Sequence, residues 1–409
     1  MLPSYFFPEQ VASTYLSSNL HEALTKASIN RIAYVPMPTR GISKEQRNEY
    51  KSHKYELMYE GYMEVHRFSM YGEGRNPLFR ALRYVFCWCK QLYYGLRTKN
   101  VDLIYLSSTP PIQGVLGGIL KKVKKVPFVY NLQDIFPDSL VGTGLAPKNG
   151  ILWKIGRVIE NFTYQNADKI IVISEDFKKN ILAKGVPEEK IVVVYNWVDE
   201  EAVKNIPREN NKLFDRYGLD RRKFYITYCG NIGLTQNMDM LLEVAKKMEA
   251  YEDIHFVLIG EGAYKEQMKK LIIEKKIHNI TLLPFQPYGD ISYVFSLGDV
   301  SLVISKPGVG ENSVPSKTWS ILSASRPVLA NFDENELKDI IEKNRCGIFT
   351  KAGDEAAFID AIFQLYVNRI RCEEFGRNGR QFIMNNLTKA VGTKKYVDVI
   401  KSYELKNND

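Results

Sequence analysis

Short apolar runs alternate with longer helical segments along most of the chain, and this alternation constrains the fold more than any other feature. Repeated strand and helix segments are typical of a parallel sheet that is covered by helices. In the first half, the pattern predicts strands at 31–35, 101–106, 126–131, 169–173 and 190–195, and helices at 19–27, 77–98, 111–122 and 151–166. The segment 40–72 is polar, rich in Tyr and aperiodic, and we interpret it as a loop or an excursion from the sheet.

A second series of the same kind follows the charged segment 199–222. It predicts strands at 224–229, 254–259, 279–283, 299–304 and 327–330, helices at 238–249, 264–275 and 315–325, and final helices near 355–367, 371–385 and 389–405. A chain of 409 residues is long enough for two cores. We therefore predict an α/β protein with two Rossmann-like domains, 1–200 and 201–370, that face a central cleft, and with C-terminal helices in 371–409 that can pack back on the first domain.

Charge and cysteine content restrict the partners and the compartment. The formal net charge of +9 favours phosphate-bearing ligands or an anionic membrane surface, whereas no helix-turn-helix, zinc-finger or RNP pattern supports nucleic acid. No run approaches the ~18 apolar residues of a membrane span, and the start does not resemble a signal peptide, so we expect a cytoplasmic protein. The cysteines are odd in number and scattered, and we interpret all five as buried thiols: Cys87, Cys89, Cys229, Cys346 and Cys372.

A glycine turn joins the first strand and the first helix of the second series. Gly230 and Gly233 allow the backbone to approach a ligand, and the free amides at a helix N-terminus suit a diphosphate. A tight turn without any ligand explains the same residues equally well.

The next strand ends in a second glycine turn, Gly260-Glu261-Gly262. It lacks the third glycine of the dinucleotide fingerprint, and no acidic residue caps a following strand about 20 residues on. The sequence therefore argues against a nicotinamide dehydrogenase.

A third segment, Ser313-Val314-Pro315-Ser316-Lys317, precedes another helix. Pro315 and Ser316 are typical helix-start residues, so Lys317 falls in the first turn. Its ammonium and the free amides can face the same anion there, which makes this segment a candidate diphosphate clamp. A surface lysine on a capped helix is the alternative.

In this order, the three segments resemble glycosyltransferase family 4, specifically its bacterial cell-surface polysaccharide branch with the colanic-acid and fucosamine transferases. The resemblance extends to Phe7-Pro8-Glu9 and to the segments 130–139, 172–175 and 195–199, and so covers nearly the whole chain. It implies the GT-B fold, a nucleotide sugar held mainly on the second domain, and transfer with retention of anomeric configuration.

The resemblance also implies a set of site residues. The donor residues that it implies are Gly230, Asn231, Gly233, Gln236, Gly260, Glu261, Gly262, Phe285, Ser313, Val314, Pro315, Ser316 and Lys317. Of these, Asn231, Gly233 and Lys317 would hold the diphosphate, and Glu261 with the Phe285 backbone would lie near the base or ribose. Glu9 and Asp134 would face the reacting groups from the first domain, with Lys317 as the third catalytic residue. The resemblance implies no cofactor and no bound metal, because basic and amide donors take the place of the cation.

The chain departs from the broad family at several positions. Arg and Lys are usual where Asn231 and Gln236 stand, a Glu is usual at Ser320, and Glu311 lies one residue from the first position of the usual Glu pair. The named branch is similar to this chain in its glycine turn and its Pro-Ser-Lys segment, so we interpret a subgroup pattern. The first strand is short, which indicates truncation or a start codon upstream.

The predicted helix 77–98 is the candidate acceptor-side element. Arg80, Arg83, Lys90 and Arg97 fall within about a third of its circumference, and its other residues are aromatic and apolar. Such a helix can lie on an anionic membrane and meet a lipid-linked acceptor. A helix packed on the first sheet with a solvated basic edge is the alternative, and both can hold.

These observations predict a retaining glycosyltransferase on the inner face of the cell membrane. It would move a sugar from a UDP- or GDP-sugar to a lipid-linked saccharide in capsule, O-antigen or exopolysaccharide synthesis. Asp134 would orient the acceptor hydroxyl, or alternatively would only cap the turn before Pro137. A nucleotide-sugar epimerase of the same fold and a non-catalytic GT-B subunit are the other candidates.

Overall fold

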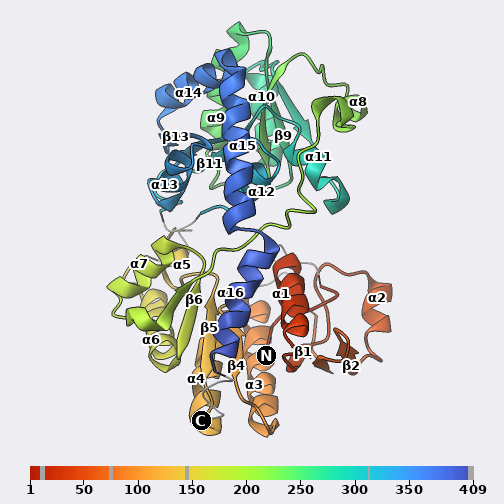
Figure 1. The fold of residues 1–409 in the computed structure, drawn as a ribbon, viewed down its shortest axis with the longest axis vertical. Coiled ribbons are helices and arrows are strands. Elements are labelled where there is room, and N and C mark those ends of the chain that lie inside the picture. Colours follow the sequence, from red (N-terminus) through yellow and green to blue (C-terminus); the bar gives the residue numbers. More distant parts are fainter. Residues whose placement is uncertain (10–13, 73–76, 143–146, 312–313, 404–409) are drawn as a thin grey trace. The chain divides into compact units, whose positions relative to one another are not determined.

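The computed structural model describes residues 1–9, 14–72, 77–142, 147–311 and 314–403. It divides into two compact units (Figure 1). The first unit is Met1–Tyr195 together with the C-terminal segment from Gly392, and the second is Asn196–Val391. The sequence placed the domain boundary between residues 200 and 201. Both units are parallel α/β folds of the Rossmann-like kind, as predicted.

Two sheets are present in the described part of the first unit. One has the order β1-β3-β2 and the other the order β4-β5-β6-β7, and all neighbours are parallel except β2 and β3. The strands are β1 (Arg31–Pro36), β2 (Tyr55–Met58), β3 (Met63–Phe68), β4 (Ile104–Ser107), β5 (Phe128–Leu132), β6 (Lys169–Val172) and β7 (Ile191–Val193).

The segment 40–72 contributes more structure than its polarity predicted. It forms α2 (Lys44–Glu49), β2 and β3, and β3 pairs with β1 along its whole length. Met63 and Val65 are fully buried in this strand and alternate with the partly exposed Glu64 and His66. This period of two is the signal of a half-buried strand, but the polar and Tyr-rich surroundings masked it.

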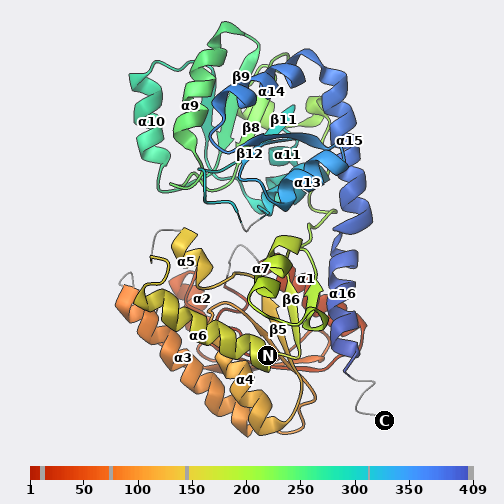
Figure 2. The same cartoon turned by 90° about the vertical axis from the view of Figure 1, so that its left-hand side faces the viewer.

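Helices cover both faces of the four-stranded sheet. Figure 2 shows α3, α4 and α6 on one side and α16 on the other. Close packing on the first side depends on small residues, because a Cβ at Gly114 would lie 2.3 Å from the Thr163 side chain and one at Gly117 would lie 2.2 Å from the Phe128 ring. The helices are α1 (Thr14–Lys26), α3 (Pro77–Arg97), α4 (Gln113–Lys124), α5 (Asp138–Gly142), α6 (Ile151–Asn166), α7 (Glu175–Ala183) and α16 (Lys389–Lys401).

The second unit is built on one six-stranded parallel sheet with the order β10-β9-β8-β11-β12-β13. Its strands are β8 (Phe224–Cys229), β9 (Ile254–Ile259), β10 (Ile280–Leu283), β11 (Val300–Ile304), β12 (Val328–Phe332) and β13 (Gly347–Lys351). Every residue of β8, β11 and β12 is buried, as expected for a parallel sheet covered on both faces.

The helices of the second unit supply the other half of its core. Residues of α9, α10 and α14 join β8 and β9 in one buried apolar cluster, while α12 packs on β11 and β12 and is itself covered by α15. The helices are α8 (Leu213–Tyr217), α9 (Met238–Lys247), α10 (Lys265–Glu274), α11 (Ile291–Phe295), α12 (Lys317–Ser323), α13 (Glu336–Lys343), α14 (Glu355–Val367) and α15 (Arg369–Asn386).

The interpretation of all five cysteines as buried thiols was wrong for one of them. Cys87 is buried on α3, but Cys89 is exposed. Two residues along a helix correspond to a rotation of about 200°, so the two side chains point to opposite sides.

Candidate functional site

The strand order of the second unit reverses beside β8. The chain passes from β8 to β9 and β10 on one side, and then returns to place β11 on the other side of β8. In open α/β sheets, ligands bind outside the carboxyl ends of the strands at such a switch point. Gly230 lies in the loop after β8, and Lys317 is the first residue of α12, which follows the loop after β11, so two predicted donor segments lie at the switch point.

The loops after β8 and β9 are joined through their backbones. The Ile232 amide donates to the Glu261 carbonyl at 2.8 Å, and the Tyr264 amide donates back to the Ile232 carbonyl at 3.0 Å. A Cβ at Gly260 would lie 1.9 Å from the Gly230 carbonyl oxygen, and one at Gly262 would lie 2.2 Å from the Ile232 oxygen. These two glycines are therefore required by the contact between the loops.

Polar side chains fix the turn after β8 from within. Gln236 Oε1 accepts from the Gly233 amide at 3.1 Å, and the Tyr228 hydroxyl donates to the Asn231 carbonyl at 2.6 Å. Gly230 has a φ of +137°, which favours glycine. The Asn231 side chain lies beside Gly233, where an added Cβ would be 2.6 Å from Asn231 Nδ2.

Lys317 lies directly above this turn. Its Nζ is 3.8 Å from the centre of the Tyr228 ring and 3.3 Å from the position that a Cβ at Gly230 would occupy. Burial lowers the pKa of Lys317 to about 8. Within the described ranges, no carboxylate forms an ion pair with this ammonium. No motif in the sequence pointed to Tyr228, whose buried ring contacts the cation through a cation–π interaction.

The rest of the predicted clamp lies just before α12. Val314 and Pro315 are partly exposed, Ser316 is exposed and its side chain makes no capping hydrogen bond, and Ser313 lies outside the described residues. Asp333 accepts from the Gly308 amide at 2.9 Å and the Gly310 amide at 2.7 Å, and so holds the loop after β11 against the end of β12. No motif in the sequence pointed to Asp333.

Glu261 and Phe285 are neighbours, because the Phe285 amide donates to the Glu261 carboxylate; their roles near the base or ribose stay predictions. Lys265 Nζ donates to Glu261 Oε1 at 2.6 Å, and this bond, aided by the Phe285 amide, lowers the pKa of the Glu261 carboxyl. The Phe285 side chain is 73% exposed.

Lys265 is a buried residue to which the sequence analysis gave no role. Its Nζ also donates to the Gly260 carbonyl at 2.7 Å and contacts the Leu283 carbonyl at 3.5 Å. It therefore connects the carboxyl ends of β9 and β10. The sequence could not predict this role, because it shows only a lysine at the start of an amphipathic helix.

Glu9, in the first unit, is buried and surrounded by backbone donors. Its carboxylate accepts from the amides of Thr39 at 2.7 Å, Arg40 at 2.9 Å and Phe6 at 3.2 Å. These bonds hold the N-terminal segment against the loop after β1. Glu9 therefore has a structural role in this unit. Its catalytic role stays a prediction.

Asp134 follows β5, at the carboxyl end of the four-stranded sheet, and is solvent-exposed. Partial desolvation by the surrounding protein raises the pKa of its carboxyl, and the Ser139 hydroxyl, which donates to it at 3.1 Å, opposes this shift. Both predicted roles, orienting a hydroxyl and capping the turn before Pro137, stay predictions at this position.

The predicted basic edge of helix 77–98 does not face solvent throughout. Arg83 is 1% exposed and donates to the Thr39 hydroxyl at 3.0 Å and the Tyr71 carbonyl at 3.2 Å. Lys90 donates to the Ser69 carbonyl at 2.6 Å, and Arg97 stacks on Tyr93. The Arg80 side chain lies outside the described residues. The expectation of one basic membrane-facing edge was therefore wrong for Arg83, because helical periodicity cannot tell which flank of a helix meets the protein.

Two family models match the chain, one on each half. The model for "Glycosyltransferase Family 4" matches residues 33–202, and that for "Glycosyl transferases group 1" matches residues 209–382. The chain belongs to glycosyltransferase family 4. The second match covers the loops after β8, β9 and β11, and therefore both glycine turns and Lys317.

Individual relatives agree with this assignment. This chain is 24% identical over 309 residues to WbjE of Pseudomonas aeruginosa, a protein named as a probable glycosyltransferase. The match covers 75% of this chain and 76% of WbjE. This chain is also 27% identical over 208 residues to WcaI of Escherichia coli (strain K12), named for colanic acid biosynthesis, with 50% and 51% covered. The second match therefore spans about half the length of that relative.

The solved structures that this glycosyltransferase resembles have the GT-B fold. The HepE protein of Anabaena, determined in complex with UDP-glucose, superposes with a TM-score of 0.69 at 16% identity and covers 98% of both chains. At this identity the likeness establishes the fold.

Among the residues that the structure describes, no three His, Cys, Asp or Glu side chains form a group that could hold a metal ion.

Gly260→Ala tests the backbone contact between the two loops. The substitution puts a methyl group against the Gly230 carbonyl at a φ of +155°, so we expect local destabilisation of about 2–4 kcal/mol. Hydrogen exchange at the amides of Ile232 and Tyr264 should accelerate at least tenfold. Gly289→Ala is the matched control, because its Cβ would meet no atom within 4 Å. Equal exchange in both variants would contradict the contact.

Proposed function

We propose that this protein transfers a sugar from a UDP- or GDP-sugar to a saccharide acceptor in the assembly of a bacterial cell-surface polysaccharide. The observation that carries the proposal is the partly buried ammonium of Lys317, which lies beside the glycine turn at the switch point and has no carboxylate partner among the described residues. Membership of family 4 supports the transferase class, and the names of WbjE and WcaI support the polysaccharide.

A diphosphate fits the chemistry around Lys317. A partly desolvated ammonium such as that of Lys317 attracts an anion more strongly than an ammonium in open water. The Tyr228 ring holds the cation over Gly230, where the absence of a side chain leaves room for a phosphate. The base and ribose would then lie toward Glu261 and Phe285, on the loops after β9 and β10. The HepE complexes with UDP and UDP-glucose support this class of donor.

We further propose transfer with retention and without a metal ion. Lys317 and the backbone amides of the turn would stabilise the charge on the departing diphosphate. The acceptor hydroxyl would attack the anomeric carbon on the face from which the diphosphate leaves, and a phosphate oxygen would take its proton. Asp134 is the candidate for orienting that hydroxyl in the first unit. No separate general base is then required.

The exposed side of α3 supports a membrane-bound acceptor, although not through the basic residues that the sequence suggested. Apolar side chains follow each other at helical spacing along this side: Phe79, Leu82, Phe86, Tyr93 and Leu96, each at least 40% exposed. A second exposed apolar group lies on α6, at Ile151, Leu152, Ile155 and Val158, beside the exposed Lys154. Both helices pack on α4.

Exposed apolar stripes of this size mark interaction surfaces, and aromatic residues with adjacent lysines suit the interface of an anionic bilayer. None of the helices in the described ranges is long and apolar enough to span a membrane. We therefore propose peripheral binding through the apolar stripes of α3 and α6, with a lipid-linked saccharide as the acceptor.

Calorimetric titration with UDP and GDP tests the donor site. Lys317→Ala should weaken binding of the preferred nucleotide at least tenfold, whereas Lys338→Ala, which removes a lysine of α13 that is paired with Glu334, should leave it unchanged. Because the pKa of Lys317 is about 8, affinity in the unmodified protein should be full below that pH and fall as the pH rises above it. Lys317→Ala should lose this pH dependence. Binding of neither nucleotide would favour a non-catalytic subunit.

Sedimentation with phosphatidylglycerol vesicles tests the membrane surface. Phe79→Ser combined with Phe86→Ser removes two large apolar side chains, and the bound fraction should fall at least tenfold. The matched control is Ile273→Ser with Val367→Ser, which changes two residues of similar exposure in the second unit. The membrane proposal fails if both double variants bind like the unmodified protein.

A further inference from the structure

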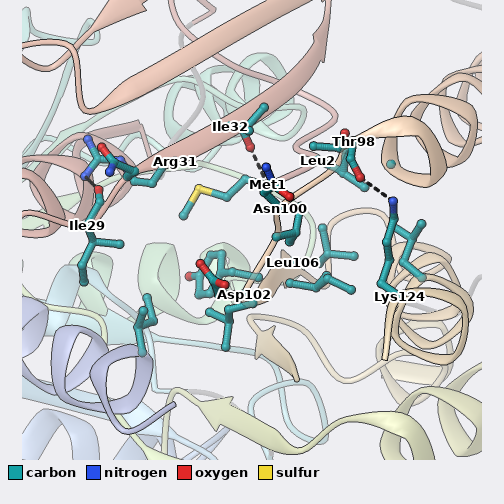
Figure 3. A pocket seen from close by; sticks show the side chains of 18 of the residues that line it. Met1, Leu2, Ile29, Arg31, Ile32, Thr98, Asn100, Asp102, Leu106 and Lys124 are labelled. Atoms are coloured by element: carbon teal, nitrogen blue, oxygen red, sulfur yellow. Dashed lines mark hydrogen bonds between the residues drawn. The ribbon is translucent and has the colours of Figure 1, made fainter. Parts of the chain in front are cut away.

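A cavity in the first unit lies at the opposite end of its strands from the loops discussed above. It has a volume of about 500 Å³, and its lining includes the residues just before β1 and β4 (Figure 3). Ligands of open α/β sheets bind at the carboxyl ends of the strands instead. The carboxyl edge of the sheet in the second unit is therefore the place where further donor-binding residues are expected.

The loop after β10 lies at this carboxyl edge. Residues 284–290 form this segment, here called the β10 loop. Neighbouring strands of a sheet are about 4.8 Å apart, so β10, two strands away from β8 in the sheet order, lies ~10 Å from β8. A ribose and a base span such a distance from a diphosphate. The β10 loop is therefore placed to contact the base of a nucleotide whose diphosphate lies at the glycine turn after β8.

The β10 loop exposes one side chain and buries the next. Phe285 is 73% exposed, whereas Gln286 is 6% exposed. Gln286 Nε2 donates to the Pro284 carbonyl at 2.7 Å and to the Tyr217 hydroxyl at 2.8 Å. Its Oε1 accepts from Arg216 Nη1 at 3.3 Å. Gln286 therefore attaches the β10 loop to α8 and leaves the neighbouring Phe285 exposed.

Asp290 attaches the other end of the β10 loop to the same helix. Its carboxylate accepts from Arg216 Nη1 at 2.8 Å and pairs with Lys212 Nζ at 2.6 Å. The hydrogen bonds from Lys212 and Arg216 lower the pKa of the Asp290 carboxyl, so this group is ionised at neutral pH. Arg216 thus contacts both Gln286 and Asp290, and one side chain of α8 connects two points of the β10 loop.

The helix α8 is itself fixed on the strand that leads into the glycine turn. Leu213 and Phe214 are buried, and the Phe214 ring packs edge-on against the Tyr225 ring of β8, with 5.6 Å between the ring centres. Just before α8, the Asn211 side chain donates to the Tyr293 carbonyl of α11 at 2.8 Å. The β10 loop is therefore connected through α8 to β8, which fixes its distance from the glycine turn.

The loop after β9 holds the other flank of the β10 loop. The Phe285 amide donates to the Glu261 carboxylate, which also accepts from Lys265. Lys265 Nζ in turn contacts the Leu283 carbonyl, at the end of β10, at 3.5 Å. The β10 loop is thus held from two sides before a nucleotide binds. A loop that is ordered in advance loses little conformational freedom on binding and keeps one shape.

We propose that Arg216 and Gln286 are positioning residues for the base of the donor nucleotide. Through the β10 loop they hold Phe285 where the base binds, and so they set the preference between a pyrimidine and a purine. This inference rests on the proposed function, because it requires the diphosphate to lie at the glycine turn. A fixed loop rejects a base of the wrong size, whereas a loose loop adapts to both sizes.

Titration of the full chain with UDP, GDP and pyrophosphate tests this inference. Arg216→Met removes the bonds to Asp290 and Gln286, and Gln286→Met removes the buried amide but keeps an unbranched side chain. Each variant should bind the preferred nucleotide about fivefold more weakly, and the ratio of the affinities for UDP and GDP should fall about threefold. Pyrophosphate affinity should not change, because Lys317 and the glycine turn are intact.

Lys246→Met is the matched control. The Lys246 side chain is 41% exposed, as is that of Arg216, and it pairs with Glu249 at 2.6 Å beyond the end of α9. This variant should bind all three ligands like the unmodified protein. Hydrogen exchange of the Phe285 amide, measured without nucleotide, should accelerate at least tenfold in Arg216→Met and Gln286→Met but not in the control.

The inference is overturned if Arg216→Met and Gln286→Met both keep the ratio of UDP to GDP affinity. It is also overturned if they lose pyrophosphate affinity as much as nucleotide affinity, because a general effect on the second unit would then explain the loss. Either result in a protein that binds UDP or GDP leaves the proposed function intact. If the unmodified protein binds neither nucleotide, the proposed function and this inference both fail.

Discussion

The backbones of the loops after β8 and β9 approach so closely that no side chain fits between them. Gly260 and Gly262 are the residues that permit this approach, and the hydrogen bonds of the Ile232 and Tyr264 amides maintain it. The glycine turn is thereby held at the switch point of the sheet, below the α12 lysine. Lys317 lies at a defined place above Gly230 only because the loop after β9 holds the glycine turn in position.

Two lysines in this region differ in whether the protein itself supplies a partner for their charge. Lys265 is buried but donates to a carboxylate and to carbonyl oxygens, so its charge is compensated within the fold. Lys317 has an aromatic ring beneath it and no carboxylate partner in the described part of the chain. A cation in that state is stabilised by an incoming anion, whereas Lys265 would have to give up existing bonds. This difference makes Lys317, and not Lys265, the candidate for binding the diphosphate.

Much of the fold could be predicted from the sequence, because buried parallel strands are continuous apolar runs. β8 and β9 have the predicted bounds, and so do α6 and α14. β3 was missed because its short alternation lies within a polar segment. The residues that organise the site, such as Tyr228 and Asp333, could not be found, because their roles arise from contacts between segments far apart in the chain. Arg83 was misassigned because a helical stripe shows spacing but not which side packs against the protein.

A crystal structure of the protein with UDP or GDP, whichever binds, tests the central claim most directly. The account predicts that the diphosphate lies at the carboxyl ends of β8 and β11, with a phosphate oxygen within about 3 Å of Lys317 Nζ and the base toward Glu261 and Phe285. A nucleotide bound elsewhere in the second unit or on the first unit, with Lys317 still unpaired, would contradict it.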